Sequence, residues 1–258
     1  RKDPRDWRTR YGQHLVPKEW WPTKTLPEWA TLLADQAPGQ LEQAPVMPGG
    51  GLFPVKDWTW LSRRFWPTEF EREAAGWDLA FGASEIGAFS VGIYGGLKQG
   101  RVYLNSEGRG RVSLPQLWVI MDAKRQEHPN CTQWNIENRA SCKSVIETVG
   151  RRIPFLVPRE PKGDKYSRAQ AWQPCVAAGN VVLPCNCGAT GFHHHEDVQT
   201  LPGEKWAVEL VIEHAQFPKG TIKDRVDAMG YLIVPLLLEN DGVVVAAISA
   251  TPPVPLPL

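Results

Sequence analysis

Long hydrophobic runs and a phosphate-binding loop are both missing from this sequence of 258 residues. No stretch approaches the roughly eighteen consecutive apolar residues of a membrane-spanning helix. The first six residues lack the apolar core of a secretory signal. The pattern Gly-x-x-x-x-Gly-Lys-Ser/Thr does not occur, and the glycine triplet at 49–51 has no lysine after it. ATP hydrolysis is therefore not expected from this chain.

Cysteine is scarce, and neither sign of charge dominates. Five cysteines form an odd number without a regular framework, which favours a reducing compartment over a disulfide-stapled secreted domain. The net charge of +1 neither requires nor excludes a nucleic-acid partner, so any basic surface must be local. With 42% hydrophobic and 22% charged residues, the chain can form a core and is not wholly disordered.

Proline content and periodicity divide the chain into three parts. Residues 1–55 are rich in proline and lack a clear period, so they are expected to form an irregular linker or the tail of a preceding domain. Residues 56–245 are expected to form one folded domain. Residues 246–258 are expected to be a proline-rich, extended C-terminal tail.

The middle part alternates between strand and helix patterns. Three strands joined by short turns are predicted at 77–81, 89–94 and 100–104. After them, helices are predicted at 113–127, 144–150, 167–178, 206–214 and 221–238, with strands at 134–137, 153–157 and 181–183. This order predicts an α/β fold, with a mixed sheet that is antiparallel in its first three strands, then parallel, and flanked by helices.

Acidic residues stand at suitable places in these elements. Asp78 lies inside an apolar run, where a charge is costly unless it is paired or holds a metal; the alternative is an edge strand with Asp78 in water. Glu137 ends a later strand. Asp224 and Asp227 share one face of the last helix, although each alone could be an ordinary acid at a helix start. Together they predict a site for Mg²⁺ or Mn²⁺, two ions of which can activate water against a phosphodiester.

Basic residues surround these acids in the sequence. Lys162, Lys165 and Arg168 form one cluster, which could also be a solvated loop. The other candidates for phosphate contact are Lys219, Lys223, Arg225, Arg109 and Arg111. Because phosphate contacts carry no sequence information, DNA cleavage is expected to be weakly sequence-specific.

Four stretches carry a family resemblance, in order from about residue 50 to residue 238. Residues 76–80 (GWDLA) resemble the first nuclease motif of the large terminase subunit of tailed bacteriophages. Residues 135–137 (NIE) with 141–143 (SCK) resemble the motif of its middle acid, and 163–170 (GDKYSRAQ) with 178–181 (AGNV) the stretch that follows. Residues 217–228 (FPKGTIKDRVDA) are similar to its last motif. The chain departs from the family at Lys223, where an acid is usual, and at Cys142, where glycine is usual; a further acid expected after the first strand corresponds to Glu85.

The resemblance implies an RNase H-like fold and a metal-dependent endonuclease that cuts concatemeric phage DNA during genome packaging. It implies that Asp78, Glu137 and Asp224 are the catalytic, metal-binding triad, with Asp227 in support. It also implies double-stranded DNA, the terminase ATPase domain, the small terminase subunit and the portal as partners, in the cytoplasm of a bacterial host and not at a membrane.

Two other hypotheses stay open at this point. Lys223 favours a DNA-binding or assembly module whose nuclease site has decayed. The loop with Cys185, Cys187 and His193 to His195 could hold a structural zinc, but the C-x-C spacing is unusual and adjacent histidines cannot all face one ion, so zinc is not expected.

Overall fold

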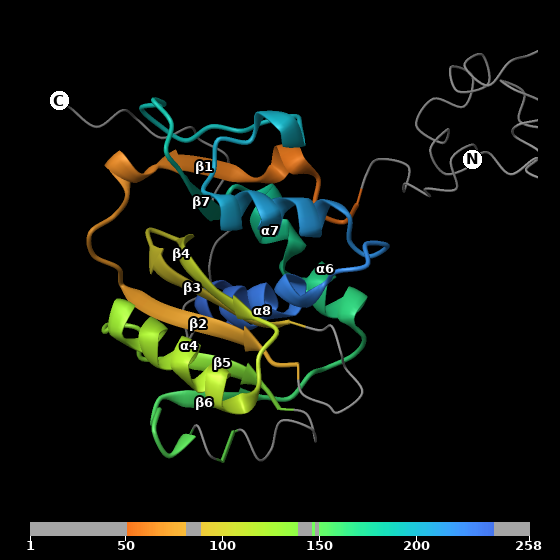
Figure 1. Ribbon diagram of the computed structural model, residues 1–258. Helices are drawn as coiled ribbons and strands as arrows, with labels where there is room; N and C mark the ends of the chain where they lie inside the picture. Colours follow the sequence, from red (N-terminus) through yellow and green to blue (C-terminus); the bar gives the residue numbers. More distant parts are fainter. Residues whose placement is uncertain (1–50, 81–88, 139–145, 148–149, 240–258) are drawn as a thin grey trace, which may run out of the picture. The chain divides into compact units, whose positions relative to one another are not determined.

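In the part of the chain that the structure describes, a mixed sheet of seven strands forms the centre of the folded domain (Figure 1). The computed structural model describes residues 51–80, 89–138, 146–147 and 150–239. The strands lie in the spatial order β1-β7-β4-β3-β2-β5-β6. Their bounds are β1 (Thr59–Ser62), β2 (Arg72–Asp78), β3 (Ser90–Lys98), β4 (Arg101–Gly110), β5 (Trp134–Glu137), β6 (Leu156–Arg159) and β7 (Val181–Cys185).

The central strands are antiparallel and the outer strands are parallel. β2 pairs with β3, and β3 with β4, in antiparallel register. β5 joins β2 in parallel and β6 joins β5, while on the other side β7 joins β4 and β1 joins β7, also in parallel. This arrangement confirms the α/β fold class, with its antiparallel first part and parallel later part.

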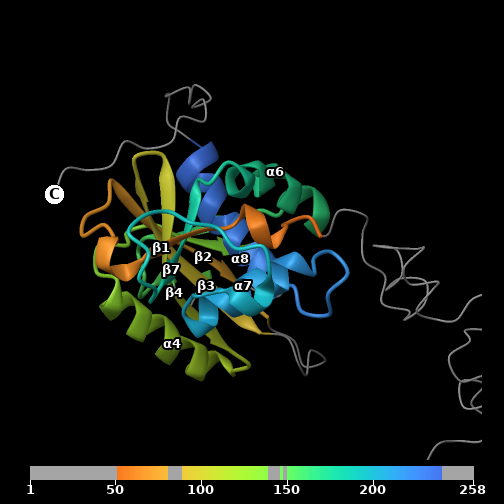
Figure 2. The ribbon, with the colours of Figure 1, turned by 90° about the horizontal axis from the view of Figure 1, so that it is seen from above.

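Helices cover both faces of the sheet. Figure 2 shows α4 on one side and α6, α7 and α8 on the other. Their bounds are α4 (Leu114–Glu127), α6 (Lys165–Ala177), α7 (Lys205–Ala215) and α8 (Asp224–Ile233); the short turns are η2 (Val55–Asp57), η3 (Arg63–Phe65) and η5 (Val198–Thr200), and the π-helical segment is η6 (Val234–Leu238). None of the helices in the described ranges is long and apolar enough to cross a membrane.

The alternation of β2 sends neighbouring side chains into different cores. Trp77 packs in one cluster with Leu117 and Met121 of α4. Ala74 belongs to the cluster on the opposite face, which contains Leu232 of α8. Because side chains two residues apart share a face, Asp78 is directed to the α8 side.

A glycine permits the close approach of α8 to β2. A Cβ atom at Gly76 would overlap the main chain of α8 at Ala228, Tyr231 and Leu232. The absence of a side chain at this position therefore allows the helix to lie directly on the strand. Asp78 stands two residues farther along the same face, so this contact also brings α8 to the acid.

Several predicted elements differ from the observed ones in their bounds. β1 was not predicted, although its Trp60 is fully buried and its neighbour Trp58 lies in the same core. The last helix, predicted at 221–238, begins only at Asp224, because Lys223 has a non-helical backbone. It ends as an α-helix at Ile233, and Pro235, which has no N–H to donate, lies in the π-helical continuation. The predicted helix at 144–150 lies largely outside the described residues.

The domain bounds stay a prediction, because residues 1–50 and 240–258 lie outside the described part. The compact unit that contains the sheet begins at Leu52. Phe53 is fully buried there and stacks on Trp172 of α6, with ring centroids 4.4 Å apart. Residues 52–55 therefore pack with the sheet domain, just before the expected start at 56.

Candidate metal-binding nuclease site

Two parallel strands bring Asp78 and Glu137 to the same edge of the sheet. Trp77 of β2 is opposite Ile136 of β5 in the parallel register, and each acid is the last residue of its strand. Asn135 and Glu137 alternate with Trp134 and Ile136, which pack with α4, so Glu137 is directed to the α8 side as Asp78 is. Glu137 is 0% exposed.

The first turns of α8 bring the other two acids to this edge. Asp224 is the first residue of the helix, and its Oδ2 accepts a hydrogen bond of 3.3 Å from the backbone N–H of Phe89. Asp227 is 4% exposed. The helix begins where the resemblance places the last acidic motif, so the four predicted acids come from one strand end, a second strand end and one helix start.

The other three carboxylates act electrostatically on Asp78. Burial raises the pKa of Asp78 well above its usual value, and the nearby carboxylate of Asp227 raises it further. Lys165 opposes this increase in the pKa of Asp78, while Glu137 and Asp224 add to it. In the described ranges, no three of these acids bring one oxygen each within 4.8 Å of one another, so the group is an open cluster. The repulsion within it is what a cation would relieve.

Two cations of α6 contact the cluster. Lys165 Nζ lies 3.0 Å from Asp227 Oδ2, and the guanidinium of Arg168 lies 2.8 Å from Asp227 Oδ1 and 3.8 Å from Glu137 Oε1. The helix that carries both cations is capped by Asp164, whose side chain accepts a hydrogen bond of 2.8 Å from Ser167 N–H. The cap fixes the start of α6 and so the position of the two cations.

The other predicted DNA contacts divide into two kinds. Lys162 and Lys219 are exposed, as a phosphate contact requires. Arg225 is 2% exposed, and its guanidinium binds the carboxylates of Glu107, Glu209 and Glu213. This burial leaves Arg225 without the surface that a phosphate contact requires, so we assign it a structural role instead. Its position at the start of a helix next to acids suggested an exposed cation, and the sequence does not reveal the three glutamates that surround it.

Tyr231 is a site residue that the sequence analysis missed. Its hydroxyl donates a hydrogen bond of 2.9 Å to Glu137 Oε1. The signal is its spacing, since Tyr231 follows Asp227 by four residues and therefore shares its helix face. Arg109 and Arg111 also lie nearby, over the ring of Phe89, with guanidinium carbons 3.7 Å and 4.3 Å from the ring centroid. Glu85 lies outside the described residues.

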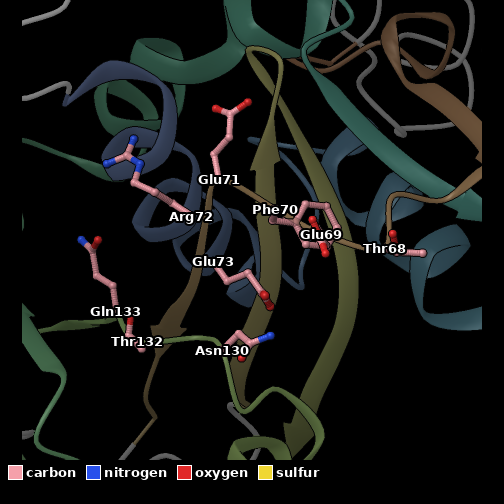
Figure 3. A pocket seen from close by; sticks show the side chains of 9 residues that line it. All are labelled: Thr68, Glu69, Phe70, Glu71, Arg72, Glu73, Asn130, Thr132 and Gln133. Atoms are coloured by element: carbon pink, nitrogen blue, oxygen red, sulfur yellow. The ribbon is translucent and has the colours of Figure 1, made fainter.

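Two cavities in the described part of the chain have different linings. A cavity of about 490 Å³ adjoins the acids and is lined by residues that include Lys162, Arg168, Asp227 and Tyr231. Figure 3 shows a second cavity, of about 390 Å³, beside the start of β2, with Glu69, Glu71 and Glu73 in its lining. None of the predicted site residues lines this second cavity, so the candidate site is the acid cluster at the carboxyl ends of β2 and β5.

Comparison with solved structures identifies the fold. No family model and no curated protein matches the sequence. The large terminase of the thermophilic bacteriophage D6E matches with a TM-score of 0.50 and 11% identity, over 73% of this chain and 45% of that protein. The large terminase nuclease of the thermophilic phage G20c matches with a TM-score of 0.48 and 11% identity, over 72% of this chain and 98% of that one, and its form with bound magnesium with a TM-score of 0.47 and 10% identity. This chain thus spans less than half of the D6E protein. The seven-stranded sheet and its flanking helices give this chain the RNase H-like fold of the D6E large terminase.

Proposed function

We propose that this chain is the nuclease part of a phage-type large terminase, a metal-dependent endonuclease that cuts concatemeric double-stranded DNA during genome packaging. The fold is compatible with this activity but does not by itself specify it. The support comes from the acids at the edge of the sheet and from the order of the motifs that carry them.

The observation that carries the proposal is the effect of three carboxylates on a fourth, that of Asp78. Asp78, Glu137, Asp224 and Asp227 come from three elements, and the last three all raise the pKa of Asp78. An acid cluster of this kind costs stability in a protein that does not use it, because burial and like charge both oppose ionisation. Clusters with such perturbed pKa values are typical of functional sites.

The residues fit hard divalent cations. The donors are carboxylate oxygens, which Mg²⁺ and Mn²⁺ prefer, and the repulsion at Asp78 falls when a cation binds. We assign Asp78, Glu137 and Asp224 to hold two ions, with Asp227 in support. Such a pair of ions supplies charge stabilisation on both sides of a phosphodiester that undergoes hydrolysis.

The remaining residues position the acids and the DNA. Tyr231 and Arg168 hold Glu137 from α8 and α6, and Lys165 and Arg168 hold Asp227. The exposed Lys162 and Lys219 are suited to contact DNA phosphates. Since these contacts do not read bases, cleavage is weakly sequence-specific.

The wider role follows from the same proposal. A terminase nuclease works with an ATPase motor, which this chain does not encode in a recognisable phosphate-binding loop. The motor domain, the small terminase subunit and the portal are then its protein partners, and the bacterial host cytoplasm is its place of action.

A DNA-binding module with a decayed nuclease site is the second candidate. Lys165 and Arg168 both pair with Asp227, and Lys223 stands at the start of α8 where the related motif has an acid. Cations inside the cluster reduce its net negative charge and therefore its need for a metal. This candidate predicts DNA retention without metal-dependent cutting.

Plasmid cleavage distinguishes the two candidates. We expect the chain to cut plasmid DNA with Mn²⁺ or Mg²⁺, and both EDTA and the Asp78→Ala substitution to abolish cutting. Asp122→Ala is the matched control, because Asp122 of α4 pairs with Arg125 outside the cluster, and it should cut as the wild type does. Cutting that survives Asp78→Ala or EDTA would refute the proposal. Gel-shift retention of the same DNA without any cutting would support the second candidate.

A further inference from the structure

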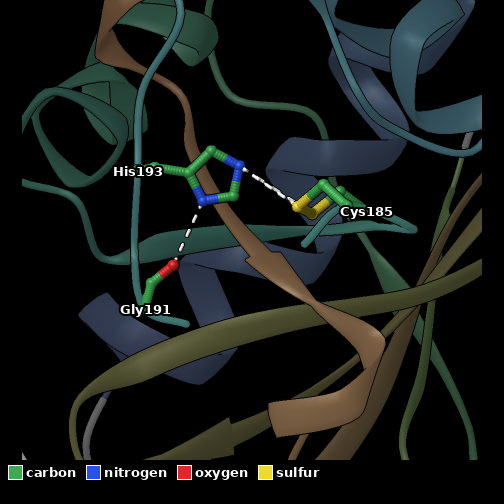
Figure 4. Close-up of a disulfide and its surroundings, with 4 residues drawn as sticks. Cys185, Gly191 and His193 are labelled. Atoms are coloured by element: carbon green, nitrogen blue, oxygen red, sulfur yellow. Dashed lines mark hydrogen bonds between the residues drawn. A yellow bond between two sulfur atoms is a disulfide. The ribbon is translucent and has the colours of Figure 1, made fainter. Parts of the chain in front are cut away.

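A loop that follows β7 brings two cysteines and a histidine to one point. His193 Nε2 lies 3.8 Å from Cys185 Sγ (Figure 4). The same nitrogen lies 3.5 Å from Cys187 Sγ. The three ligand atoms all lie within 4.8 Å of one another. Sulfur and imidazole nitrogen are the donors that zinc prefers in proteins, in contrast to the carboxylates of the nuclease site.

Strand β1 of the sheet pairs with both Cys185 and His193. Cys185 is the last residue of β7, is paired with Ser62 of β1, and is fully buried. The backbone of His193 exchanges two hydrogen bonds with Trp60 of β1, of 2.9 Å and 3.1 Å. Two segments that are separate in sequence are therefore fixed against the same strand, which preorganises the group.

The orientation of His193 is that of a metal ligand. Its Nδ1 lies 3.1 Å from the carbonyl oxygen of Gly191, which can only accept, so Nδ1 carries the proton and donates (Figure 4). In the neutral ring, Nε2 then has a free lone pair, and this atom faces the two sulfurs. Metal-binding histidines usually donate their other ring N–H to a carbonyl or carboxylate in this way.

The two histidines that follow are directed differently. His194 Nδ1 lies 3.1 Å from the carbonyl oxygens of both Lys56 and Trp58. His195, two residues after His193, has its ring centroid 5.3 Å from that of His193. Among the residues that the structure describes, none offers a hydrogen-bond partner to His195 Nε2, although this atom is buried. One zinc ion therefore needs only His193 and His195, which are two residues apart. The objection that three adjacent histidines cannot all face one ion does not apply to this pair.

We propose that, in the reduced protein, Cys185, Cys187 and His193 bind one zinc ion, and that His195 completes the tetrahedral set after rotation of its side chain. The two cysteines form a disulfide in the structure. A thiol or phosphine reductant supplies the two electrons, and two protons from water give two thiols. Zinc binding then releases both thiol protons, so the bound form has two thiolates and a neutral imidazole.

The proposed ion ties the long loop between β7 and α7 to the edge of the sheet. It is independent of the proposed nuclease function, because β4 and β3 lie between β7 and β2 in the sheet and no ligand is shared with the acids. The disulfide closes a segment with only one intervening residue, so it removes little chain entropy, whereas a metal joins three points of the loop and strand.

Metal analysis of the purified chain tests the proposal. The chain is reduced with a phosphine, equilibrated with zinc and desalted, and it should retain one zinc per chain in an Asp78→Ala background, which separates this site from the acid cluster. Replacement of zinc by cobalt should give a thiolate-to-cobalt charge-transfer band in the near ultraviolet. That band reports sulfur ligands and is independent of nuclease activity.

Variants of the loop identify the ligands. Cys187→Ser and His193→Ala should each weaken zinc binding by at least tenfold and reduce the charge-transfer band, while His195→Ala should give a smaller loss. His194→Ala is the matched control from the same loop and should bind as the background does. Circular dichroism confirms that each variant is folded. Absence of stoichiometric zinc or of the band in the reduced, folded chain would overturn the proposal, as would full binding by both Cys187→Ser and His193→Ala.

Discussion

The hydroxyl of Tyr231 donates a hydrogen bond of 2.9 Å to Oε1 of Glu137, and this bond joins helix α8 to strand β5. Burial, followed by the nearby Glu137 carboxylate, raises the pKa of Tyr231, so the phenol stays protonated and remains a donor. The two residues are 94 positions apart in the sequence. Their contact fixes one acid of the candidate site relative to the helix that carries two others.

Removal of this hydroxyl should destabilise the site. Tyr231→Phe removes the buried hydroxyl that donates to Glu137 Oε1, so we expect the free energy of unfolding to fall by about 1–3 kcal/mol. Urea unfolding with an unchanged m-value measures this loss. Tyr166→Phe is the control, since the ring of Tyr166 stacks on Phe217 and this packing is kept. Equal stability of Tyr231→Phe and wild type would contradict the structural role of the bond.

Gly76 should not tolerate even one added methyl group. Gly76→Ala places a Cβ against the main chain of α8, which cannot rotate away, so we expect a loss of about 3 kcal/mol or more and a displaced helix. Gly188→Ala is the matched control, because its Cβ would have no atom within 4 Å, and its effect should stay within about 0.5 kcal/mol. Thermal unfolding of both variants gives the comparison. A fully stable Gly76→Ala protein would show that α8 does not lie directly on β2.

Arg225 should contribute to stability and not to phosphate contact. Arg225→Met removes the cation that neutralises the buried Glu107 and Glu213, so we expect a loss of about 3–5 kcal/mol. Lys205→Met is the control: its side chain is 92% exposed and 4.0 Å from Glu209, so it should change stability by less than about 0.5 kcal/mol. Chemical denaturation measures both. If Arg225→Met left stability unchanged but weakened DNA binding, the assigned roles would be reversed.

The raised pKa of Asp78 predicts how stability depends on pH without divalent ions. A raised pKa means that the folded chain binds the proton more tightly than the unfolded chain does. The contribution is therefore fully present below the ordinary value of 3.8, and it is lost as the pH rises through the raised pKa. In EDTA, Asp78→Asn should lose less stability than the wild type over this range, as measured by thermal unfolding at a series of pH values. Parallel pH profiles for the two proteins would contradict the assigned environment.

Divalent ions should restore the stability that the wild type loses when Asp78 is ionised. With Mg²⁺ or Mn²⁺ at about 100 times the dissociation constant, linkage predicts a gain of about 2.7 kcal/mol in unfolding free energy. Asp78→Asn should gain much less, because it lacks one of the proposed ligands. A monovalent chloride salt at the same ionic strength as the divalent salt controls for electrostatic screening. Equal stabilisation of both proteins by Mg²⁺ would argue against Asp78 as a ligand.

The sequence by itself determined the elements that carry the acids. The apolar run around Asp78 and the short run that ends on Glu137 were readable as strands, and Ser113 was readable as the cap of α4, because strands and helix starts have local signatures. The start of α8 was predicted at 221, before its observed start at Asp224. The motif order then predicted that these acids meet, together with the mixed sheet that brings the strand ends together. These features depend on residues a few positions apart, whose relative directions the backbone period fixes.

Only the tertiary structure decided which partners meet across long sequence distances. Whether Arg225 faces solvent or three glutamates depends on where α7 and β4 lie, and no local pattern contains that information. The same holds for Tyr231 beside Glu137 and for His193 beside the two cysteines, since each pair is set by the packing of elements against the sheet. Periodicity fixes the face on which a side chain lies, whereas the order of the strands and the close approach of the helices choose what it meets there.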